Sequence, residues 1–487
     1  MQTLPTQLYS AQQARDIDRM AQQLLSITGF QLMTKAAQAG FNVIQKHYPS
    51  VKKIAVVCGA GNNAGDGYLI ATIAIQAGYL VQLVSLVAEE KLHGDAARAK
   101  QAFIVAGGKI LQDYLEIDHT TDLVVDALFG TGLDRTVTGH FADVISYINT
   151  LSTPVLAIDI PSGVNADTGN IMGCAICANM TITFIVLKKG LYTGLAADYC
   201  GTIIFADLAV PDTIIQSVLS KERLLIPSKL TKRNASAHKG HFGHLLIVGG
   251  DYGYAGAVHL TAKAALNSGA GLISVATRRE HALQVHLFSP ELMGHALEQL
   301  ADISQLLAKA TVLVLGPGMA QGEWAKSIWP TLIALDVPRV IDADALNLLA
   351  NEPTYSDSWI LTPHPGEAAR LLHCSTADIL QDRYAAVRRL QKKYGGVCVL
   401  KGSGTLICAG DGVDVNTTGN PGMASGGMGD VLSGLIGSLL AQKYSLIEAA
   451  QQGVYLHGLA ADKAAKIKGQ RGLHATDVLQ YLAEVVN

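Results

Sequence analysis

Charged side chains are scarce in this chain of 487 residues. Asp, Glu, Lys and Arg make up 16% of it, whereas about a quarter is usual in soluble domains. The 37 basic residues stand against 40 acidic ones, and the formal net charge is −3. With no basic excess, we expect neither a nucleic acid nor a membrane surface as a partner. Any anion that this protein binds is expected to be a small molecule held locally.

Long apolar runs and paired cysteines are also missing. No run approaches the roughly 18 apolar residues that cross a bilayer, and the N-terminal segment has no apolar signal core. The seven cysteines are an odd and scattered set, and Cys174 and Cys177 form a CxxC without a second pair or a histidine at zinc spacing. We therefore expect a reduced, cytoplasmic protein and propose no zinc.

The chain has instead many apolar strand-like runs and a tenth of its residues as glycine, 49 in all. Hydrophobic residues make up 49% of the chain, which fits parallel sheets buried on both faces. After two helices between residues 10 and 47, such runs are expected at residues 53–58, 80–87, 123–126, 154–159 and 180–187. A second series is expected at 244–249, 271–277, 311–316, 339–342, 359–362 and 397–401. Helical segments separate the strands, as a doubly wound sheet requires.

The regular alternation lapses between about residues 217 and 240, where the sequence is polar, basic and interrupted by Pro227. The length of the chain also favours more than one domain. We therefore expect an N-terminal domain at residues 1–220, a linker at 221–240 and a C-terminal domain at 241–487. The motifs of the two domains differ, so we interpret them as different α/β folds and not as a duplication.

The most informative motif is NPGMASGGMGDVLSG at residues 420–434. Gly422, Gly426, Gly427 and Gly429 leave the backbone free for positive φ, so that successive amides can converge on an anion where a helix begins, expected at residues 431–440. The helix dipole adds to this site. Asp430 at its edge is a candidate base for a bound hydroxyl, so the motif indicates phosphoryl transfer to an alcohol.

Three loops of the N-terminal half follow predicted strands: GAGNNAGDG, DALFGTGLDR and AIDIPSG. The first contains a weak dinucleotide fingerprint, but no acidic residue closes the strand at residues 80–87, which argues against an ordinary dehydrogenase. Singly, Asn63, Asp126, Asp159 and Ser162 are as consistent with helix caps and turns as with a site. As a set at three strand ends, they offer oxygen ligands for a hard cation, with Asp159 left as an acid or base.

These motifs carry a family resemblance over nearly the whole chain. NNAGDG, DALFGTGLDR and DIPSG occur in the order of the YjeF-type NAD(P)H-hydrate epimerases, which the first half resembles. The second half resembles the NAD(P)H-hydrate dehydratases of the ribokinase-like group, through GHFGHLLIVGGDYGYAGA, LGPGM, DADALNLL, LTPHPGEAARLL, KGSGT and NPGMASGGMGD. The fused order is similar to that of the bifunctional bacterial enzymes. The resemblance implies a Rossmann-like doubly wound domain followed by a ribokinase-like α/β domain.

What the resemblance implies is repair of hydrated NADH and NADPH. The first domain would interconvert the R and S forms of the hydrate, NAD(P)HX. The second would dehydrate the S form at the expense of ADP, giving NAD(P)H, AMP and phosphate. Potassium is implied for the first site, and Mg²⁺ is expected with the nucleotide, although no dedicated protein cage for it is evident. A homo-oligomer is also expected.

The resemblance also transfers residue roles. Asp159 and Asp430 are the expected catalytic residues, and both also contact substrate. The other hydrate-binding positions implied in the first site are Asn62, Asn63, Ala64, Gly65, Asp66, Gly130, Thr131, Gly132, Leu133, Asp134, Arg135 and Thr136. In the second site Ala257, Gly318 and His364 would face the hydrate. The expected nucleotide-binding residues are Lys401, Gly402, Ser403, Gly404, Thr405 and Gly429. The expected potassium ligands are Asn63, Asp126 and Ser162.

Two departures and several alternatives accompany this interpretation. Ala64 stands where the family usually has glycine, which is acceptable only if that position needs no positive φ. Met428 replaces a commoner small polar residue but keeps its amide. In the alternative interpretations, Lys401 only covers a strand end with its stem, and His364 is only a turn residue. For the whole chain, the alternative is a ribokinase-like small-molecule kinase fused to a nucleotide-binding module without catalysis.

Overall fold

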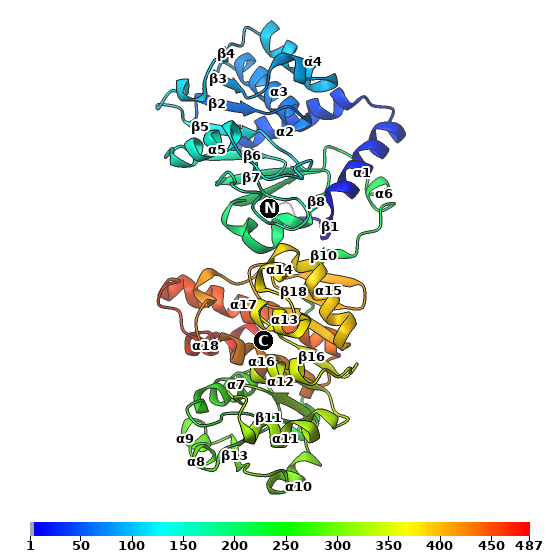
Figure 1. Ribbon diagram of the computed structural model, residues 1–487, viewed down its shortest axis with the longest axis vertical. Helices are drawn as coiled ribbons and strands as arrows, with labels where there is room; N and C mark the ends of the chain where they lie inside the picture. The colour runs from blue at the N-terminus through cyan, green and yellow to red at the C-terminus, as the bar shows by residue number, and fades with distance from the viewer. Residues whose placement is uncertain (1–3) are drawn as a thin grey trace. The chain divides into compact units, whose positions relative to one another are not determined.

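The computed structural model describes residues 4–487 and divides into two compact units, residues 1–223 and 224–487. Both are α/β, as the sequence predicts (Figure 1). The strand β10 (Glu222–Leu224) lies inside the segment 221–240 that the sequence indicates as a linker. Among the described residues, no helix is long and apolar enough to cross a membrane.

Unit 1 is built on a parallel sheet of seven strands in the order β4-β3-β2-β5-β6-β7-β9. The strands are β2 (Lys53–Cys58), β3 (Leu80–Ser85), β4 (Ile110–Leu111), β5 (Leu123–Ala127), β6 (Val155–Ile158), β7 (Met180–Phe184) and β9 (Thr202–Ala206). Five of these were predicted as strands, with ends that differ by up to three residues. The predicted strand at 180–187 ends early, and Leu187–Lys188 form the separate strand β8, which pairs with β1 (Gln7–Tyr9).

The two faces of this sheet are covered by different helices because alternate residues of each strand point to opposite sides. In β2, Ile54 and Val56 pack in one core with α1 (Ala11–Leu24), α2 (Gly29–His47), α3 (Asn62–Gln76) and α4 (Gly94–Val105). Their neighbours Ala55 and Val57 pack in the other core, with α5 (His140–Thr150). Burial on both faces is the physical reason that the strands appear in the sequence as continuous apolar runs.

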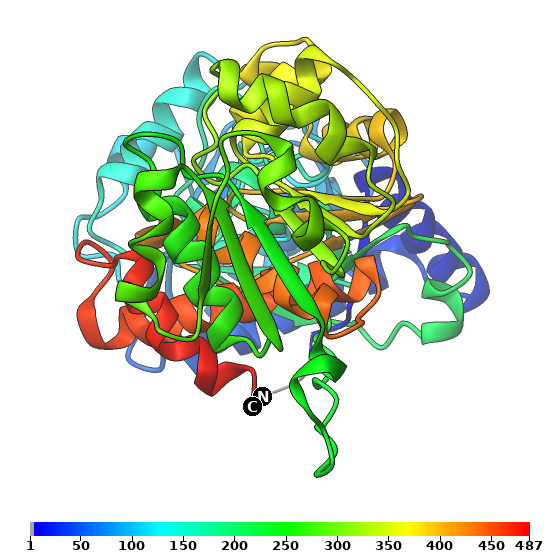
Figure 2. The same ribbon diagram turned by 90° about the horizontal axis from the view of Figure 1, so that it is seen from below.

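Unit 2 contains nine paired strands in the order β13-β12-β11-β14-β15-β16-β17-β18-β19. The parallel ones are β11 (His244–Val248), β12 (Leu272–Thr277), β13 (Met293–Ala296), β14 (Val312–Leu315), β15 (Arg339–Ile341), β16 (Trp359–Leu361) and β17 (Val397–Leu400). In Figure 2, β11 and β12 are the two neighbouring green strands. The strands β18 (Leu406–Ala409) and β19 (Gly412–Val415) add an antiparallel hairpin.

The helix that follows the glycine-rich motif is central to unit 2. It is α16 (Met428–Ala441), which begins three residues earlier than predicted and packs against α7 (Ala255–Asn267) and α17 (Leu446–Lys468). All residues from Val431 to Ala441 are buried. A helix that is apolar on every side belongs in the interior, and this fixes the position of its polar N-terminal turn.

Candidate functional site

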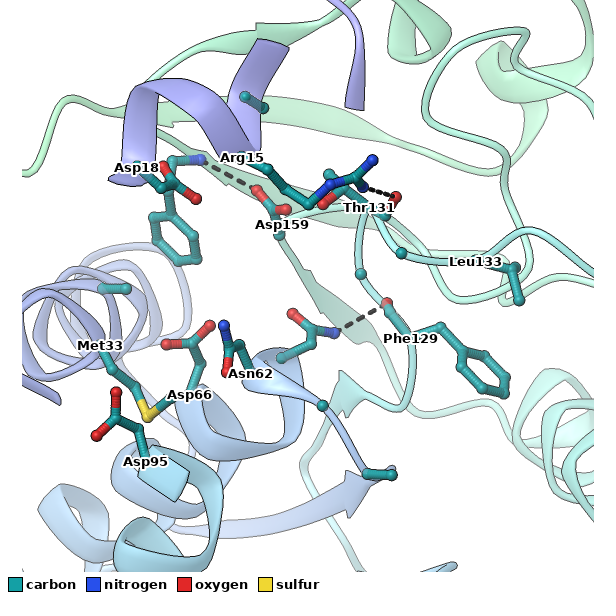
Figure 3. Close-up of a pocket in the computed structure, with 18 of the residues that line it drawn as sticks. Arg15, Asp18, Met33, Asn62, Asp66, Asp95, Phe129, Thr131, Leu133 and Asp159 are labelled. Atoms are coloured by element: carbon teal, nitrogen blue, oxygen red, sulfur yellow. Dashed lines mark hydrogen bonds between the residues drawn. The ribbon is translucent and has the colours of Figure 1, made fainter. Parts of the chain in front are cut away.

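A pocket of about 800 Å³ lies in unit 1 where the order of the strands reverses. The chain proceeds from β2 outward to β3 and β4, and then returns to place β5 on the other side of β2. Ligands in open α/β sheets bind at such a switch point, beyond the carboxyl ends of the strands. The loops after β2, β5 and β6 and the helix α1 all contribute to the pocket wall (Figure 3).

Most of the substrate residues predicted for the first site line this pocket. They are Asn62, Asn63, Asp66, Gly130, Thr131, Gly132, Leu133, Asp134, Arg135 and Asp159. Three predicted residues do not line it: Ala64, Gly65 and Thr136. The pocket also has lining residues that the sequence did not indicate, among them Arg15, Asp18, Met33 and Lys188.

The NNAGDG segment forms the first turns of α3 and not an open loop. Ala64 is fully buried and is not among the residues with positive φ, so alanine is accommodated there without strain. Gly65 is buried against Met33: a Cβ at this glycine would lie 2.5 Å from the Met33 sulfur. These two residues pack α3 against α2, and the side chains of Asn62, Asn63 and Asp66 are the ones that reach the pocket.

The three predicted potassium ligands form one connected group below the loop after β5. Asp126 is completely buried; it accepts hydrogen bonds from the Ser162 hydroxyl at 2.6 Å and the Ser162 amide at 2.8 Å. Burial raises the pKa of Asp126 to about 6, although these hydrogen bonds and one from the Leu128 amide lower it. Asn63 donates to the carbonyl of Phe129 at 2.9 Å, and its own Oδ1 is buried without a hydrogen-bond partner.

An unpaired buried oxygen is energetically unfavourable, because it has lost its hydrogen bonds to water. Asn63 Oδ1, together with the oxygens of the connected Asp126 and Ser162, therefore fits a hard monovalent cation that prefers neutral and carboxylate oxygens. No group of three or more His, Cys, Asp or Glu side chains among residues 4–487 is arranged to hold a metal ion.

Asp159 follows β6 and takes a left-handed conformation, with φ at 68°. Such a conformation is unfavourable for a residue with a Cβ, and residues held in it cluster at functional sites. The carboxylate forms an ion pair with Lys188. Lys188 is almost completely buried, and its ammonium also donates to the Thr183 hydroxyl at 3.1 Å and the Phe184 carbonyl at 3.0 Å.

Two further carboxyl groups share this environment. Asp66 is 9% exposed, and burial raises its pKa well above the usual range, with the charges of Asp159 and Asp18 adding to the effect and Lys188 opposing it. Burial also raises the pKa of Asp18 to about 6, while Lys188 lowers it and Asp159 raises it. Asp18 and Lys188 lie outside the three loop motifs, so no local pattern of residues indicated either of them.

In unit 2 the N-terminus of α16 carries Asp430 in its first turn, after Gly427 at φ 86°. Of the four glycines expected to be free for positive φ, only Gly427 uses it; Gly422, Gly426 and Gly429 do not. Gly429 does not use it because the helix has already begun at Met428, and helical φ is negative. The amides at this helix N-terminus are still available to an anion.

Asp430 belongs to a cluster of charges. Burial raises its pKa to about 7, with Asp342 adding to this, Lys401 opposing it, and Asp344 and Glu367 contributing smaller increases. Asp342 is 1% exposed and accepts hydrogen bonds from Lys401 at 2.8 Å and from Ser433 at 2.6 Å. Although burial favours the neutral form of Asp342, Lys401 and these hydrogen bonds hold its pKa below the usual value.

Lys401 connects two carboxylates. Its ammonium lies 2.8 Å from Asp342 and 3.8 Å from Glu367. Burial lowers the pKa of Lys401, but the charges of Asp342, Glu367 and Asp430 outweigh burial and raise it. A Cβ at Gly429 would lie 3.3 Å from the Lys401 ammonium, so this predicted nucleotide residue adjoins the same group. Lys401 thus does more than cover a strand end.

His364 is the N-cap of α13 (Pro365–Leu372). Its Nδ1 accepts from the amides of Gly366 at 3.0 Å and Glu367 at 3.4 Å, while Glu367 accepts from the His364 amide at 2.7 Å. The ring is half exposed, and its Nε2 lies 3.4 Å from Glu367. His364 is therefore a helix cap and, through Glu367, a neighbour of the Lys401 cluster. Glu367 stands in the quoted TPHPGE motif, but only its histidine was assigned a role.

The KGSGT loop, residues 401–405, runs from β17 to β18, and the guanidinium of Arg383 binds its backbone carbonyls. Arg383 is 2% exposed and donates to the carbonyls of Leu400 at 3.2 Å, Lys401 at 3.1 Å and Gly404 at 3.1 Å, and also to that of Ser403. Gly402 and Gly404 adopt positive φ. These carbonyls face Arg383, while Gly402 and Ser403 of the loop are exposed.

Ala257 and Gly318 are brought together from segments 61 residues apart in the chain. A Cβ at Gly318, where φ is 59°, would lie 3.1 Å from the Ala257 Cβ and 2.7 Å from the carbonyl oxygen of Tyr254. Only glycine fits this close approach. Thr405 ends the KGSGT loop, and its hydroxyl donates to the Gly402 carbonyl at 2.9 Å.

Comparison with known proteins gives two family matches and full-length relatives. Residues 29–190 match the YjeF-related protein N-terminus, and residues 245–484 match the NAD(P)H-hydrate dehydratase family. A bifunctional NAD(P)H-hydrate repair enzyme of Coxiella burnetii is 45% identical over 99% of this chain and 100% of that protein. The Escherichia coli enzyme of the same description is 42% identical, covering 100% and 95%.

Among solved structures, an ADP/ATP-dependent NAD(P)H-hydrate dehydratase from Bacillus subtilis, co-crystallised with ATP and Mg²⁺, is similar to part of the chain. It is 29% identical, with a TM-score of 0.48, and the match covers 53% of this chain and 93% of that one.

Proposed function

Because the chain belongs to the bifunctional NAD(P)H-hydrate repair enzymes, we propose that its two polar sites perform the two repair reactions, one in each unit. The protein is an epimerase and a dehydratase of hydrated NADH and NADPH. The observation that supports the division most directly is that each unit has its own aspartate beside a lysine. Asp159 pairs with the buried Lys188, and Asp430 lies near the partly buried Lys401, which pairs with Asp342.

In the first site we propose that the hydrate occupies the pocket of unit 1, with Asp159 acting at C6 of its ring. The supporting geometry is the left-handed Asp159 at the strand end and the lining residues of the loop 130–135. Potassium would be held by Asn63, Asp126 and Ser162, and it would supply a positive charge that orients the loop or the substrate. The unpaired Asn63 Oδ1 is the feature of this chain that supports it.

In the second site we propose that Asp430 removes the proton of the C6 hydroxyl while that oxygen accepts the β-phosphoryl group of ADP, releasing AMP. The C6–O bond then breaks and phosphate leaves, pushed by the lone pair of the ring nitrogen; loss of a C5 proton completes NAD(P)H. Lys401 and the amides at residues 427–429 would stabilise the transferring phosphoryl group, since fixed donors act strongly on developing charge.

We propose that residues 401–405 and Gly429 bind the nucleotide, and that Ala257, Gly318 and His364 face the hydrate. Mg²⁺ would be bound mainly by the nucleotide phosphates and would neutralise part of their charge. The domain limits 1–220, 221–240 and 241–487, the cytoplasmic location and a homo-oligomeric state are proposals as well. Limited proteolysis tests the first, fractionation the second and sedimentation velocity the third.

The experiment that tests both assignments uses a racemic hydrate of NADH with ADP, or with ATP, and follows the near-ultraviolet absorbance of reduced nicotinamide. The wild-type protein is expected to recover all of the hydrate. Asp159→Asn should recover the S half rapidly and the R half only at its spontaneous rate. Fast repair of the R form by that variant would remove Asp159 from the reaction. Accumulation of a phosphorylated product without recovered absorbance would instead favour a small-molecule kinase.

A further inference from the structure

Lys188 cannot be the proton donor of the first site, because its three N–H donors are already used. They are directed to Asp159, the Thr183 hydroxyl and the Phe184 carbonyl, and the side chain is 4% exposed. Lys188 therefore acts as a positioning residue that holds the Asp159 carboxylate through an ion pair and fixes its direction.

Epimerisation at C6 needs an acid as well as a base. The hydroxyl leaves readily only if it receives a proton and departs as water, and the water that returns to the opposite face must give up a proton. A carboxylate paired with a lysine can accept a proton but has none to donate at the start of the reaction. The site therefore requires a second group that enters the reaction in its protonated form.

Asp66 has the position and the environment of such a group. It lies in the first turns of α3, it is 9% exposed, and it lines the same pocket as Asp159. Figure 3 shows the two carboxyl groups on different walls, Asp66 on α3 and Asp159 after β6. Burial favours the neutral form of Asp66, and the nearby charges of Asp159 and Asp18 act in the same direction. Two carboxyl groups whose surroundings differ in this way are suited to opposite roles.

We propose that Asp66 is the acid of the epimerisation, acting across the pocket from Asp159 as the base. The proposal rests on the epimerase function proposed for unit 1. Asp66 gives its proton to the C6 hydroxyl, the C6–O bond breaks, water leaves, and the ring nitrogen lone pair forms an N1=C6 double bond. A water molecule then attacks the opposite face of C6 and its proton passes to Asp159. Exchange of both protons with solvent restores the starting state.

Asp18 on α1 has a supporting role in this arrangement. Its charge adds to the burial that keeps Asp66 protonated, and it also faces Lys188. Replacing Asp18 by asparagine is expected to weaken the acid only in part, because burial remains the largest effect on Asp66. Comparing Asp18→Asn with Asp66→Asn therefore separates loss of the acid itself from loss of a charge that helps to keep it protonated.

The test measures interconversion of purified R and S hydrates by chromatography without nucleotide, so that unit 2 is idle. Asp66→Asn is expected to lower kcat by ~10²–10⁴, the usual worth of a positioned acid, with KM within about threefold of wild type. Asp66→Glu should keep part of the activity, since it retains a carboxylic acid displaced by one methylene. The matched control is Asp143→Asn, an exposed acidic residue in the first turn of α5, which should behave as wild type.

Several outcomes would overturn the proposal. A raised KM with unchanged kcat in Asp66→Asn would make Asp66 a binding group only, and a wild-type rate would remove it from the site. Loss of epimerisation in Asp18→Asn but not in Asp66→Asn would assign the acid to Asp18. If Asp66→Asn does not fold, Asp66→Glu carries the test. A folded Asp66→Glu variant that still binds the hydrate, as measured by competition, but reacts no faster than buffer alone would also contradict the proposal.

The outcome for the proposed function itself is separate. If the wild-type chain does not interconvert the R and S hydrates, the epimerase assignment fails before any variant is compared. Addition of ADP to each variant provides a second readout, because dehydration of the S form by unit 2 should proceed at the wild-type rate in all of them.

Discussion

Lys401 and Asp342 directly follow strands β17 and β15, and their charged atoms lie 2.8 Å apart beside the first turn of α16. Asp342 is almost fully buried and also accepts a hydrogen bond from Ser433 of α16. The pair therefore joins the sheet to the helix that carries Asp430. Its position makes it both a structural contact and the positive end of the proposed phosphoryl site.

Replacing Lys401 by methionine is expected to reduce both stability and dehydration. Removing one partner of a buried ion pair leaves the other uncompensated, which costs about 3–5 kcal/mol. The double variant Lys401→Met with Asp342→Asn should regain much of that stability but no activity. Urea unfolding and the dehydration rate measure the two effects. Equal stability of the single and double variants would contradict a direct interaction.

Asp430→Asn is expected to lower the dehydration rate by ~10²–10⁴ and to leave epimerisation unchanged, because a positioned base contributes about that much. The control is a chromatographic assay of R and S interconversion by the same preparation. Normal dehydration by this variant would exclude Asp430 as the base.

The pH dependence of dehydration should reflect Asp430, whose pKa is raised to about 7. A base must be deprotonated, so the rate is expected to rise with pH through this region and to level off above it. Glu367, whose pKa burial also raises to about 7, titrates in the same range. A Glu367→Gln variant that keeps the rising limb would assign it to Asp430, and one that loses it would assign it to Glu367.

The raised pKa of Asp430 also predicts that its ionised form, which the reaction needs, lowers the stability of the folded protein. Because the folded pKa of Asp430 lies above its ordinary value of 3.8, the folded state holds this proton more tightly than the unfolded chain. Its contribution to stability is complete below about pH 4 and is lost as the pH rises through about 7. Asp430→Asn should therefore unfold at higher urea concentration than wild type at pH 8, with little difference at pH 4.

Potassium should stabilise unit 1. A ligand that binds only the folded state raises the unfolding temperature, and the stabilisation grows with the logarithm of its concentration relative to its Kd. Differential scanning in potassium chloride should give a higher Tm for the transition of unit 1 than the same concentration of tetramethylammonium chloride. Asn63→Ala should abolish the difference. A potassium effect that persists in this variant would place the ion elsewhere.

Gly429→Ala should raise the KM for ADP several-fold with little loss of stability. The added methyl group would lie 3.3 Å from the Lys401 ammonium and 3.5 Å from an Asp342 oxygen. It would therefore occupy space in the proposed nucleotide site. The control is Gly322→Ala, where a Cβ meets open space. Steady-state kinetics with varied ADP checks both, and an unchanged KM in Gly429→Ala would remove this position from the nucleotide site.

The sequence indicated the continuous apolar strands well and the short or hairpin strands poorly. β2 and β17 are continuous apolar runs because they are covered on both faces, which is visible in the residue types alone. β4 has only two residues, and β18 and β19 pair with each other across Gly410, which has φ 62°. Such segments depend on their neighbours for pairing, so their own residues gave no comparable signal.

The sequence by itself determined the two α/β units, their family and the strand-end motifs, because burial and turn chemistry act locally along the chain. Only the tertiary structure decided which charges meet. Lys188 reaches Asp159 across 29 residues, and Ser433 reaches Asp342 across 91. The protonation of Asp66 and Asp430 depends on such distant partners and on burial. Since the strength of a charge interaction depends on distance in space and on the surrounding medium, no local pattern of residues could specify it.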